Sequence, residues 1–249
     1  MSLVVYADFS CPYCYLASRR VDALCAGGVA VDWRAVEHKP LMLVGGQRLG
    51  AAEQDELTKE FVELTGGLLP GEQLPWAMPG ITPKTEAAVS AYAEAYGAGV
   101  ADDVRRLLFA LYWVEGADIG NPNVLRTPLA GPILRGNSTA DPLRESGYAV
   151  SVDRGPVTTD AYRRIRAWRT EWTQLGSQSL LVLLDCAVTL TGFDAVHRLA
   201  KEIAYVGAPP NPDLGNPRRY PEISVHPQAA WVSQIGRPWA YTRRPITTG

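Results

Sequence analysis

The chain has 249 residues, 47% hydrophobic and 20% charged, an ordinary balance for a globular protein with room for one domain interrupted by a second. A formal net charge of −2 gives no basis for binding nucleic acid or an anionic membrane. No apolar run approaches the ~20 residues that span a bilayer, and the first residues lack the features of a secretory signal, so we expect a cytoplasmic protein without a membrane partner.

The first forty residues predict a strand, a helix and a second strand. The apolar run Leu3–Ala7 suits a buried strand. Apolar residues then recur at helical spacing until Gly27 ends the helix. Val29–Val36 alternates apolar and polar residues, as a strand does. This order places Cys11 and Cys14 at the start of the first helix.

The middle of the chain is predicted to be helical. Apolar residues share one helical face over Leu57–Leu64 and again over Val104–Leu111. Between these segments, Thr82-Pro83 predicts an N-cap followed by the first residue of a further helix. Three prolines predict that the stretch after residue 120 is broken: Pro122, Pro128 and Pro132.

From residue 150 the pattern alternates again. Tyr162–Leu175 carries an aromatic and apolar stripe at helical spacing, and Gly176 ends it. Leu180–Leu184 predicts a buried strand, and Val196–Ile203 predicts another amphipathic helix. We therefore expect an α/β protein: a discontinuous domain of residues 1–45 and 150–205, an all-helical insertion of residues 46–149, and a proline-rich C-terminal extension of residues 206–249.

The chemistry is expected at Cys11-Pro12-Tyr13-Cys14. Two cysteines at this spacing can close a small disulfide ring at the start of a helix. The positive end of the helix dipole favours a thiolate on Cys11, and Pro12 suits a first turn that needs no N–H donor. Cys11 is thus predicted to attack or be attacked, and Cys14 to resolve the mixed disulfide. Tyr13 supplies a bulky, uncharged neighbour.

Other interpretations of the cysteine pair remain. A structural zinc needs four ligands, and the chain has no second CxxC. Its three histidines are scattered at His38, His197 and His226. We therefore expect no metal and no other cofactor, and the remaining alternatives are a pair without a redox role and a centre that has lost activity.

Three further residues have two interpretations each. Asp8 could relay the proton of Cys14, or it could cap the first helix as loop aspartates commonly do. Cys25 lies on the apolar face of the first helix, and Cys186 follows a predicted buried strand. Because a free cysteine behaves as a small hydrophobe, we expect both to be core residues rather than reactive thiols.

Three stretches resemble a known family. Asp8–Leu16, which contains the CPYC motif, resembles the opening of DsbA-like thioredoxin-fold proteins, especially the FrnE-like dithiol–disulfide isomerase branch. That branch is similar to 2-hydroxychromene-2-carboxylate isomerases and kappa-class glutathione transferases. Val31–Pro40 resembles the family's second strand and the turn after it, and Leu108–Pro122 resembles a helix end of its inserted domain. The resemblance covers roughly residues 3–205.

The resemblance implies a thioredoxin-like fold split by a helical insertion, with redox exchange at Cys11 and Cys14. The isomerase and transferase relatives have serine where Cys11 stands, which favours a thiol–disulfide oxidoreductase or isomerase. Two alternatives stay open: a small-molecule isomerase or glutathione transferase-like enzyme that does not need Cys14, and a binding module without catalysis. The expected partners are thiols and disulfides of proteins or small molecules, glutathione among them.

One segment departs from the family pattern. The family has a cis-proline loop that faces the CxxC and contacts the substrate, and Leu181 stands at the proline position here. A cis peptide before a residue other than proline costs about 3–4 kcal/mol, so we expect a trans bond. Leu180 and Leu181 are then the candidate residues of the substrate groove. Trp231 and Trp239 near the C-terminus leave open a homodimer contact or a tail packed on its own core.

Overall fold

A computed structural model describes residues 3–75, 78–136, 148–176, 179–186 and 188–210. All of these residues lie in one compact unit that spans residues 1–218. The predicted tail with Trp231 and Trp239 falls outside the described residues. None of the helices within these ranges combines the length and the apolar character of a membrane span.

Four strands form the central sheet, in the order β2-β1-β5-β6. β1 (Leu3–Ala7) runs parallel to β2 (Val31–Ala35) and antiparallel to β5 (Leu181–Asp185). β6 (Val188–Thr191) pairs antiparallel with β5 at the edge. The three apolar segments of the sequence therefore are strands as predicted. β6 was not predicted, because its short, largely exposed run lacks the apolar character of a buried strand.

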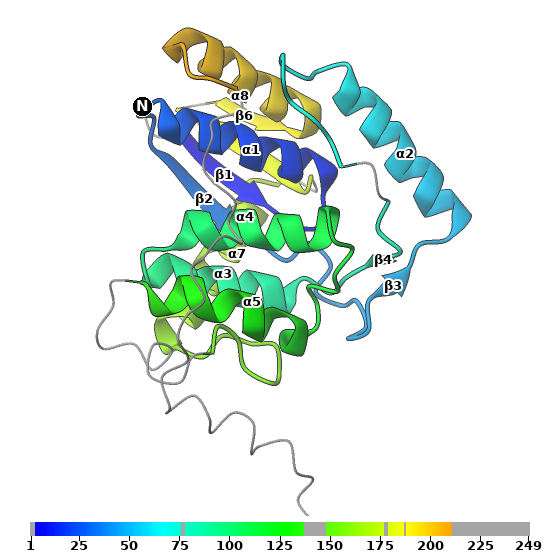
Figure 1. The fold of residues 1–249 in the computed structure, drawn as a ribbon, viewed down its shortest axis with the longest axis vertical. Helices are drawn as coiled ribbons and strands as arrows, with labels where there is room; N and C mark the ends of the chain where they lie inside the picture. Colours follow the sequence, from blue (N-terminus) through cyan, green and yellow to red (C-terminus); the bar gives the residue numbers. More distant parts are fainter. Residues whose placement is uncertain (1–2, 76–77, 137–147, 177–178, 187, 211–249) are drawn as a thin grey trace, which may run out of the picture. The chain divides into compact units, whose positions relative to one another are not determined.

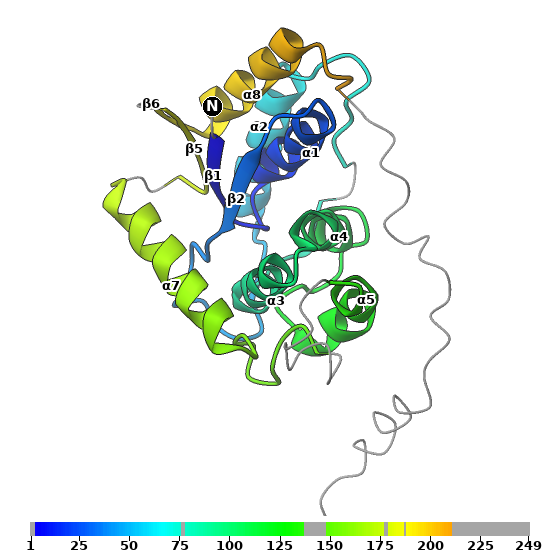
Figure 2. The same cartoon turned by 90° about the vertical axis from the view of Figure 1, so that its left-hand side faces the viewer.

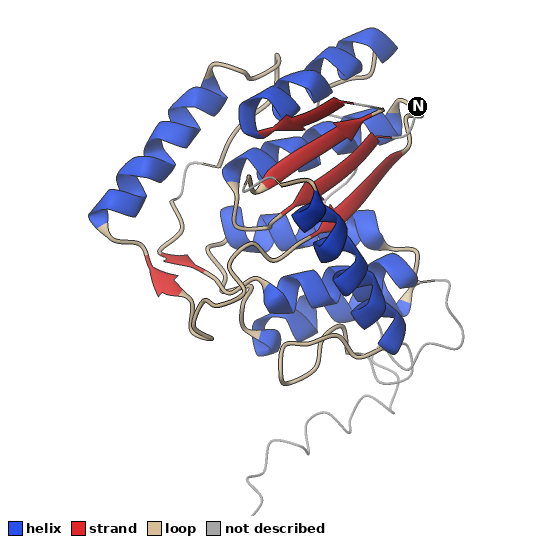
Figure 3. Cartoon of the chain, turned by 180° about the vertical axis from the view of Figure 1, so that it is seen from behind, coloured by secondary structure: helices blue, strands red, loops and turns tan. Residues whose placement is uncertain are grey.

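Helices lie on both sides of this sheet (Figures 1, 2 and 3). α1 and α8 pack together on one side, with α2 beside α1, whereas α7 lies on the other side against β2 and α3. α3, α4 and α5 pack on one another. The helices within the described residues are α1 (Pro12–Ala26), α2 (Ala51–Thr65), α3 (Glu86–Gly97), α4 (Ala101–Trp113), α5 (Pro122–Leu134), α7 (Thr159–Gln174) and α8 (Gly192–Val206).

The sheet uses residues from both ends of the described chain, and α2 to α5 come from the segment between them. This element order is that of a thioredoxin-like α/β fold with helices inserted after the first βαβ unit. The boundaries at residues 45, 150 and 206 stay a prediction.

A fully buried guanidinium joins α1 to its neighbours. Arg20 donates two hydrogen bonds to the carboxylate of Glu72, at 2.9 and 2.7 Å. It also donates to the carbonyl oxygens of Val196 in α8, at 2.7 Å, and of Gly67 just after α2, at 2.6 Å. Because a buried charge is stable only when it is paired and hydrogen-bonded, this network fixes α1, α8 and the end of α2 in one arrangement.

A second buried guanidinium joins α1 to α4. Arg105 donates to Asp22 at 2.5 Å and to the carbonyl oxygen of Ser18 at 3.0 Å. Its guanidinium also stacks on the Trp33 ring, 5.1 Å from the ring centre. The inserted helices are thus tied to α1 by charge as well as by apolar contact.

The predicted helix start at Thr82-Pro83 is wrong. Thr82 ends the short strand β4 (Ile81–Thr82), which pairs with β3 (Gln47–Arg48), and α3 begins only at Glu86. Backbone pairing between segments that are distant in sequence overrides the local N-cap preference here.

The prediction that the prolines break the chain after residue 120 is also wrong, because Pro128 and Pro132 lie inside α5. Each proline removes one backbone hydrogen bond, at a cost of ~3 kcal/mol or more. Three apolar side chains of the same helix are almost completely buried, and burial of each contributes ~1.5–3 kcal/mol. They are Leu125, Leu129 and Ile133. Packing therefore offsets the loss.

Candidate functional site

The loop between β1 and α1 positions the first cysteine. Cys11 is the N-cap of α1, with φ −101° and ψ 129°, and its carbonyl oxygen accepts the first helical hydrogen bond, from Tyr15 at 3.1 Å. Pro12 follows as the first helical residue. Within the described chain the Cys11 side chain caps no backbone N–H. Its sulfur is therefore free of a capping hydrogen bond at the positive end of the helix, where the residue lies buried with 1% of its surface exposed.

The second cysteine lies one turn further into the helix and is fully buried. Its thiol donates a hydrogen bond to the carbonyl oxygen of Leu180 at 3.2 Å. Burial, followed by a hydrogen bond with Cys11, raises the pKa of Cys14 well above its ordinary value. Cys14 is thus held as a protonated thiol, and Cys11, also a free thiol, faces a cavity.

The segment that faces the cysteines in the family has Leu180 and Leu181 here. The peptide bond before Leu181 is trans, as the absence of proline predicted. Leu180 lies in the cavity wall, whereas the Leu181 side chain is fully buried in β5. Of these two candidate groove residues, the structure therefore brings only Leu180 to the site.

Asp8 lies buried in the same loop and accepts four hydrogen bonds. One oxygen accepts from the N–H and the hydroxyl of Ser10, at 2.9 and 2.8 Å. The other accepts from the backbone N–H of His38 at 2.9 Å and the hydroxyl of Thr85 at 3.0 Å. The predicted helix cap is therefore wrong, because Asp8 ties its loop to the segments before α3 and after β2. Its role as a proton relay for Cys14 stays a prediction.

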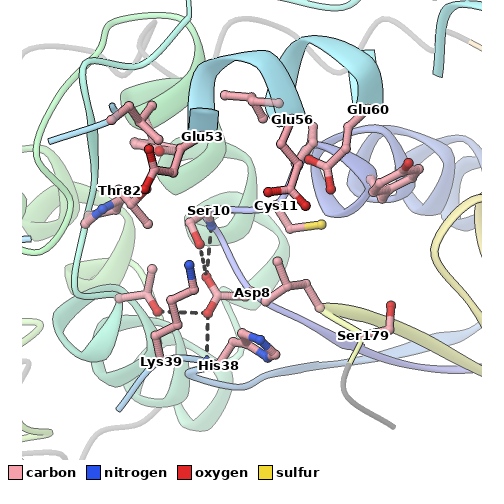
Figure 4. A pocket seen from close by; sticks show the side chains of 18 of the residues that line it. Asp8, Ser10, Cys11, His38, Lys39, Glu53, Glu56, Glu60, Thr82 and Ser179 are labelled. Atoms are coloured by element: carbon pink, nitrogen blue, oxygen red, sulfur yellow. Dashed lines mark hydrogen bonds between the residues drawn. The ribbon is translucent and has the colours of Figure 1, made fainter. Parts of the chain in front are cut away.

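A cavity of about 380 Å³ opens in front of Cys11 (Figure 4). This volume lies within the range of small-ligand sites. Its lining comes from the β1–α1 loop, the segment between β2 and α2, α2 itself, β4 and the residues between β4 and α3, α4, the two residues before β5, and the start of α8. The lining residues are Asp8, Ser10, Cys11, Pro12, Tyr13, His38, Lys39, Met42, Leu49, Glu53, Glu56, Leu57, Glu60, Thr82, Pro83, Thr85, Tyr112, Ser179, Leu180 and Gly192.

One wall of the cavity is acidic. Glu53, Glu56 and Glu60, together called the α2 carboxylates below, share one helical face with Leu57 and line the cavity. Figure 4 shows the carboxylates of Glu56 and Glu60 pointing toward Cys11. None of the three forms an ion pair with any residue in the described ranges. Burial, followed by the charges of Glu56 and Glu63, raises the pKa of Glu60 to about 7.

The opposite wall contains His38 and Lys39. Burial lowers the pKa of His38, so its imidazole is neutral at pH 7. Its ring packs edge-on against Trp172 of α7, with the ring centres 5.7 Å apart. Lys39 is the only lysine or arginine among the described residues that line the cavity. The cavity therefore carries more negative than positive charge.

Tyr13, between the two cysteines, points toward the same helix. Its hydroxyl donates a hydrogen bond to the carboxylate of Glu63. Burial and this hydrogen bond raise the pKa of Tyr13, so the side chain stays neutral. Tyr13 therefore links the CxxC turn to α2.

The two other cysteines lie on the surface, which corrects the prediction that both are core residues. Cys25 lies in the last turn of α1, and Cys186 has φ 55° in the turn from β5 to β6. Helix ends and hairpin tips extend past the layers that would cover them, so an apolar neighbourhood in sequence does not bury these positions.

The acidic wall was not predicted. The glutamates at the start of α2 were consistent with a favourable helix dipole, and their spacing places them on one face. The sequence holds no further signal that this face lies over Cys11. Across the described ranges, no three His, Cys, Asp or Glu side chains come together as a metal site would require.

A thioredoxin-like sheet with two cysteines at the start of the first helix defines the class of thioredoxin-fold proteins with a dithiol site. A family model agrees: the DsbA-like thioredoxin domain matches residues 2–130. The chain belongs to this DsbA-like family. No curated protein matches it by sequence.

Solved structures share its fold at low sequence identity. A probable DsbA oxidoreductase from Streptomyces coelicolor is 19% identical, with a TM-score of 0.58 over 83% of this chain and 90% of the other. A 2-hydroxychromene-2-carboxylate isomerase is 15% identical, with a TM-score of 0.57 over 83% and 96%. The cytosolic disulfide reductase DsbM from Pseudomonas aeruginosa is 14% identical, with a TM-score of 0.55 over 83% and 97%. These similarities establish the fold.

Proposed function

We propose that this protein is a cytoplasmic thiol–disulfide oxidoreductase or isomerase, with Cys11 as the attacking thiolate and Cys14 as the resolving thiol. The observation that carries the proposal is the asymmetry of the two sulfurs. Both cysteines are buried, with 1% of Cys11 and none of Cys14 exposed, but of the two only Cys11 lines the cavity, at a helix N-terminus, whereas Cys14 donates to the Leu180 carbonyl. An attacking sulfur must be reachable, and a resolving sulfur must wait as a thiol.

The exchange proceeds in two steps. The Cys11 thiolate attacks a substrate disulfide, which forms a Cys11–substrate disulfide and releases one substrate sulfur as a thiolate. Cys14 then loses its proton and attacks the Cys11 sulfur, which closes the Cys11–Cys14 disulfide and releases the second substrate sulfur. Two electrons pass from the protein to the substrate, and the two protein thiol protons end on the released thiols. The reverse sequence oxidises a substrate dithiol.

The fold relatives support this proposal. The DsbA-like family and a disulfide reductase among the neighbours favour thiol chemistry, and a structure of DsbM with glutathione points to thiol partners. The cytosolic location given for DsbM favours the same compartment here. A reducing cytosol would keep the exposed thiols of Cys25 and Cys186 free.

The direct test is the reduction potential of the Cys11–Cys14 pair. A background variant with Cys25→Ser and Cys186→Ser removes the two exposed thiols, which would otherwise form their own disulfides. The protein is equilibrated with 2-mercaptoethanol and its disulfide, a neutral couple, and the free thiols are counted by alkylation. A two-electron couple between about −270 and −120 mV supports the proposal, since working thiol–disulfide proteins span that range. Absence of a reversible couple would contradict it.

The cavity favours a second candidate, a small-molecule isomerase or transferase that uses Cys11 alone. Its volume of about 380 Å³ suits a small ligand, and an isomerase of small molecules shares the fold. The two candidates differ in their need for Cys14. Full activity of Cys14→Ala without a trapped mixed disulfide would favour the second.

A further inference from the structure

The α2 carboxylates give the cavity an electrostatic character that the redox chemistry does not require. Glu53, Glu56 and Glu60 contribute three acidic groups, and Lys39 is the one lysine or arginine among the described lining residues. His38 is neutral because burial lowers its pKa. A substrate that reaches Cys11 must therefore pass a wall with excess negative charge.

This acidic face differs from an ordinary solvated helix face. Charged helix faces generally point to water. Here Glu53, Glu56 and Glu60 border the cavity that contains the reactive sulfur, and Glu60 is half-buried. Asp55 is exposed, as Glu53 and Glu56 also are, but it does not line the cavity. α2 thus carries carboxylates that line the cavity and one that does not, so the two kinds can be compared on the same helix.

We propose that the α2 carboxylates select thiols and disulfides that carry a positive charge close to the sulfur, and disfavour anionic ones such as glutathione. This inference rests on the proposed function of Cys11. A cleft lined by charges of one sign raises the association rate of oppositely charged molecules by about 10–1,000-fold. The same field opposes an anionic substrate at the step that brings its sulfur to Cys11.

Two sources share this chemistry. One is a small aminothiol, in which an ammonium group lies two carbons from the sulfur. The other is a cysteine beside lysine or arginine in a polypeptide. The cavity volume is large enough for a whole aminothiol. Of a polypeptide, it is large enough for the cysteine side chain and the adjacent basic side chain. A comparison of cystamine with a disulfide-bonded peptide that has arginine next to cysteine distinguishes the two sources.

The test uses methanethiosulfonate reagents that differ in charge. The Cys11 thiolate attacks the sulfenyl sulfur of the reagent, a disulfide forms, and the sulfur–sulfonyl bond breaks as methanesulfinate leaves with the electron pair. Reagents with a trimethylammonium or a sulfonate group are compared on the full chain with Cys25→Ser and Cys186→Ser. A nearby charge also alters the fraction of Cys11 that is present as thiolate. This fraction affects the rates of both reagents equally, so it cancels in their ratio.

We expect the cationic reagent to react at least about tenfold faster than the anionic one. Glu56→Gln and Glu60→Gln should each lower the ratio several-fold, and the double variant should bring it close to one. Asp55→Asn removes a carboxylate from the same helix away from the cavity and should leave the ratio unchanged. Higher salt should also lower the wild-type ratio, which gives a readout without any substitution.

Three outcomes would overturn the inference: a wild-type ratio near one, a ratio unaffected by the two glutamine variants, or an equal effect of Asp55→Asn. None of them affects the proposed redox function, which is judged by the potential of the Cys11–Cys14 couple. Conversely, a charge preference without a redox couple would support the selectivity and refute the oxidoreductase. Failure of every reagent to reach Cys11 would refute both.

With small disulfides, cystamine should react faster than bis(2-hydroxyethyl) disulfide, and oxidised glutathione should react most slowly. A faster reaction of the arginine–cysteine peptide than of cystamine would identify a polypeptide substrate, and the reverse order would identify an aminothiol. If oxidised glutathione reacts fastest, the inference is wrong.

Discussion

Charge is handled differently in two regions that meet at α1. Between α1, α8 and α4, the buried guanidinium groups of Arg20 and Arg105 each have a carboxylate partner within 2.7 Å. At the cavity, Glu56 and Glu60 have no ion-pair partner within the described part of the chain. The first region fixes the fold, since a buried charge without its partner is costly.

In the second region, the charge on Glu60 lowers the stability of the fold. Burial and, after it, repulsion by Glu56 and Glu63 raise the pKa of Glu60, which means that the folded chain holds this carboxylate at a cost. Groups that lower stability and face a reactive atom are typical of functional sites. The comparison therefore separates charges that stabilise the fold from charges that we propose act on a substrate, and each prediction below tests one side of it.

The largest effect is expected at the reactive sulfur. Cys11→Ser should abolish thiol–disulfide exchange, because a hydroxyl does not form the attacking thiolate at neutral pH. The measurement is the rate of reduction of bis(2-hydroxyethyl) disulfide. Cys14→Ala is the matched control and should accumulate a mixed disulfide on Cys11, visible by mass spectrometry. Equal trapping by both variants would contradict their assigned roles.

Next in size is the loss of a buried partner. Arg20→Met leaves the Glu72 carboxylate buried without its cation and should lower the free energy of unfolding by about 3–5 kcal/mol, measured by urea denaturation. The double variant with Glu72→Gln should lose less than the single variant. Arg163→Met breaks the exposed pair with Asp160 and should cost under about 1 kcal/mol. If Arg20→Met also lowered the free energy of unfolding by under about 1 kcal/mol, its ion pair would not fix the fold, and the proposed difference between the two regions would be wrong.

A pH dependence of the charge preference should follow from Glu60. Its pKa of about 7 means that it is mostly neutral at pH 6 and mostly charged at pH 8. Glu56 and Glu63 on α2 raise this pKa and Lys39 opposes them, while Tyr13 stays neutral. The ratio of cationic to anionic reagent rates should therefore rise severalfold from pH 6 to 8. In Glu60→Gln this rise should disappear, and its persistence there would assign it to another group.

The smallest expected effect is on stability. The pKa of Glu60 rises from 4.5 to about 7 on folding, so the folded chain binds the proton more tightly than the unfolded chain. The stability that this proton provides is complete below pH 4.5 and is lost as pH rises through about 7. Since solvent screens this half-buried group, Glu60→Gln should stabilise the protein at pH 8 by about 1 kcal/mol, with little gain at pH 5. Destabilisation at pH 8 would show that the carboxylate is structural.

The opening of the fold could be predicted from local pattern alone. A continuous apolar run determines β1, period-3.6 and period-2 spacing of apolar residues determine α1 and β2, and Gly27 follows α1 directly. These elements bury their apolar sides against one another, so the apolar positions in their sequences indicate which side of each element is packed. The same pattern sets Cys11 at the helix start and Cys14 one turn inside it, which is most of the proposed redox site.

Tertiary structure decided what surrounds that pair. Thr82 joins a strand instead of capping a helix, and Cys25 and Cys186 are exposed, because distant segments set the pairing and the cover at these positions. The acidic wall depends most on tertiary structure. The spacing of Glu53, Glu56 and Glu60 fixes their common face, but the packing of α2 beside α1 turns that face toward Cys11. Local sequence determines which residues share a face, and only the long-range packing of the chain determines what that face meets.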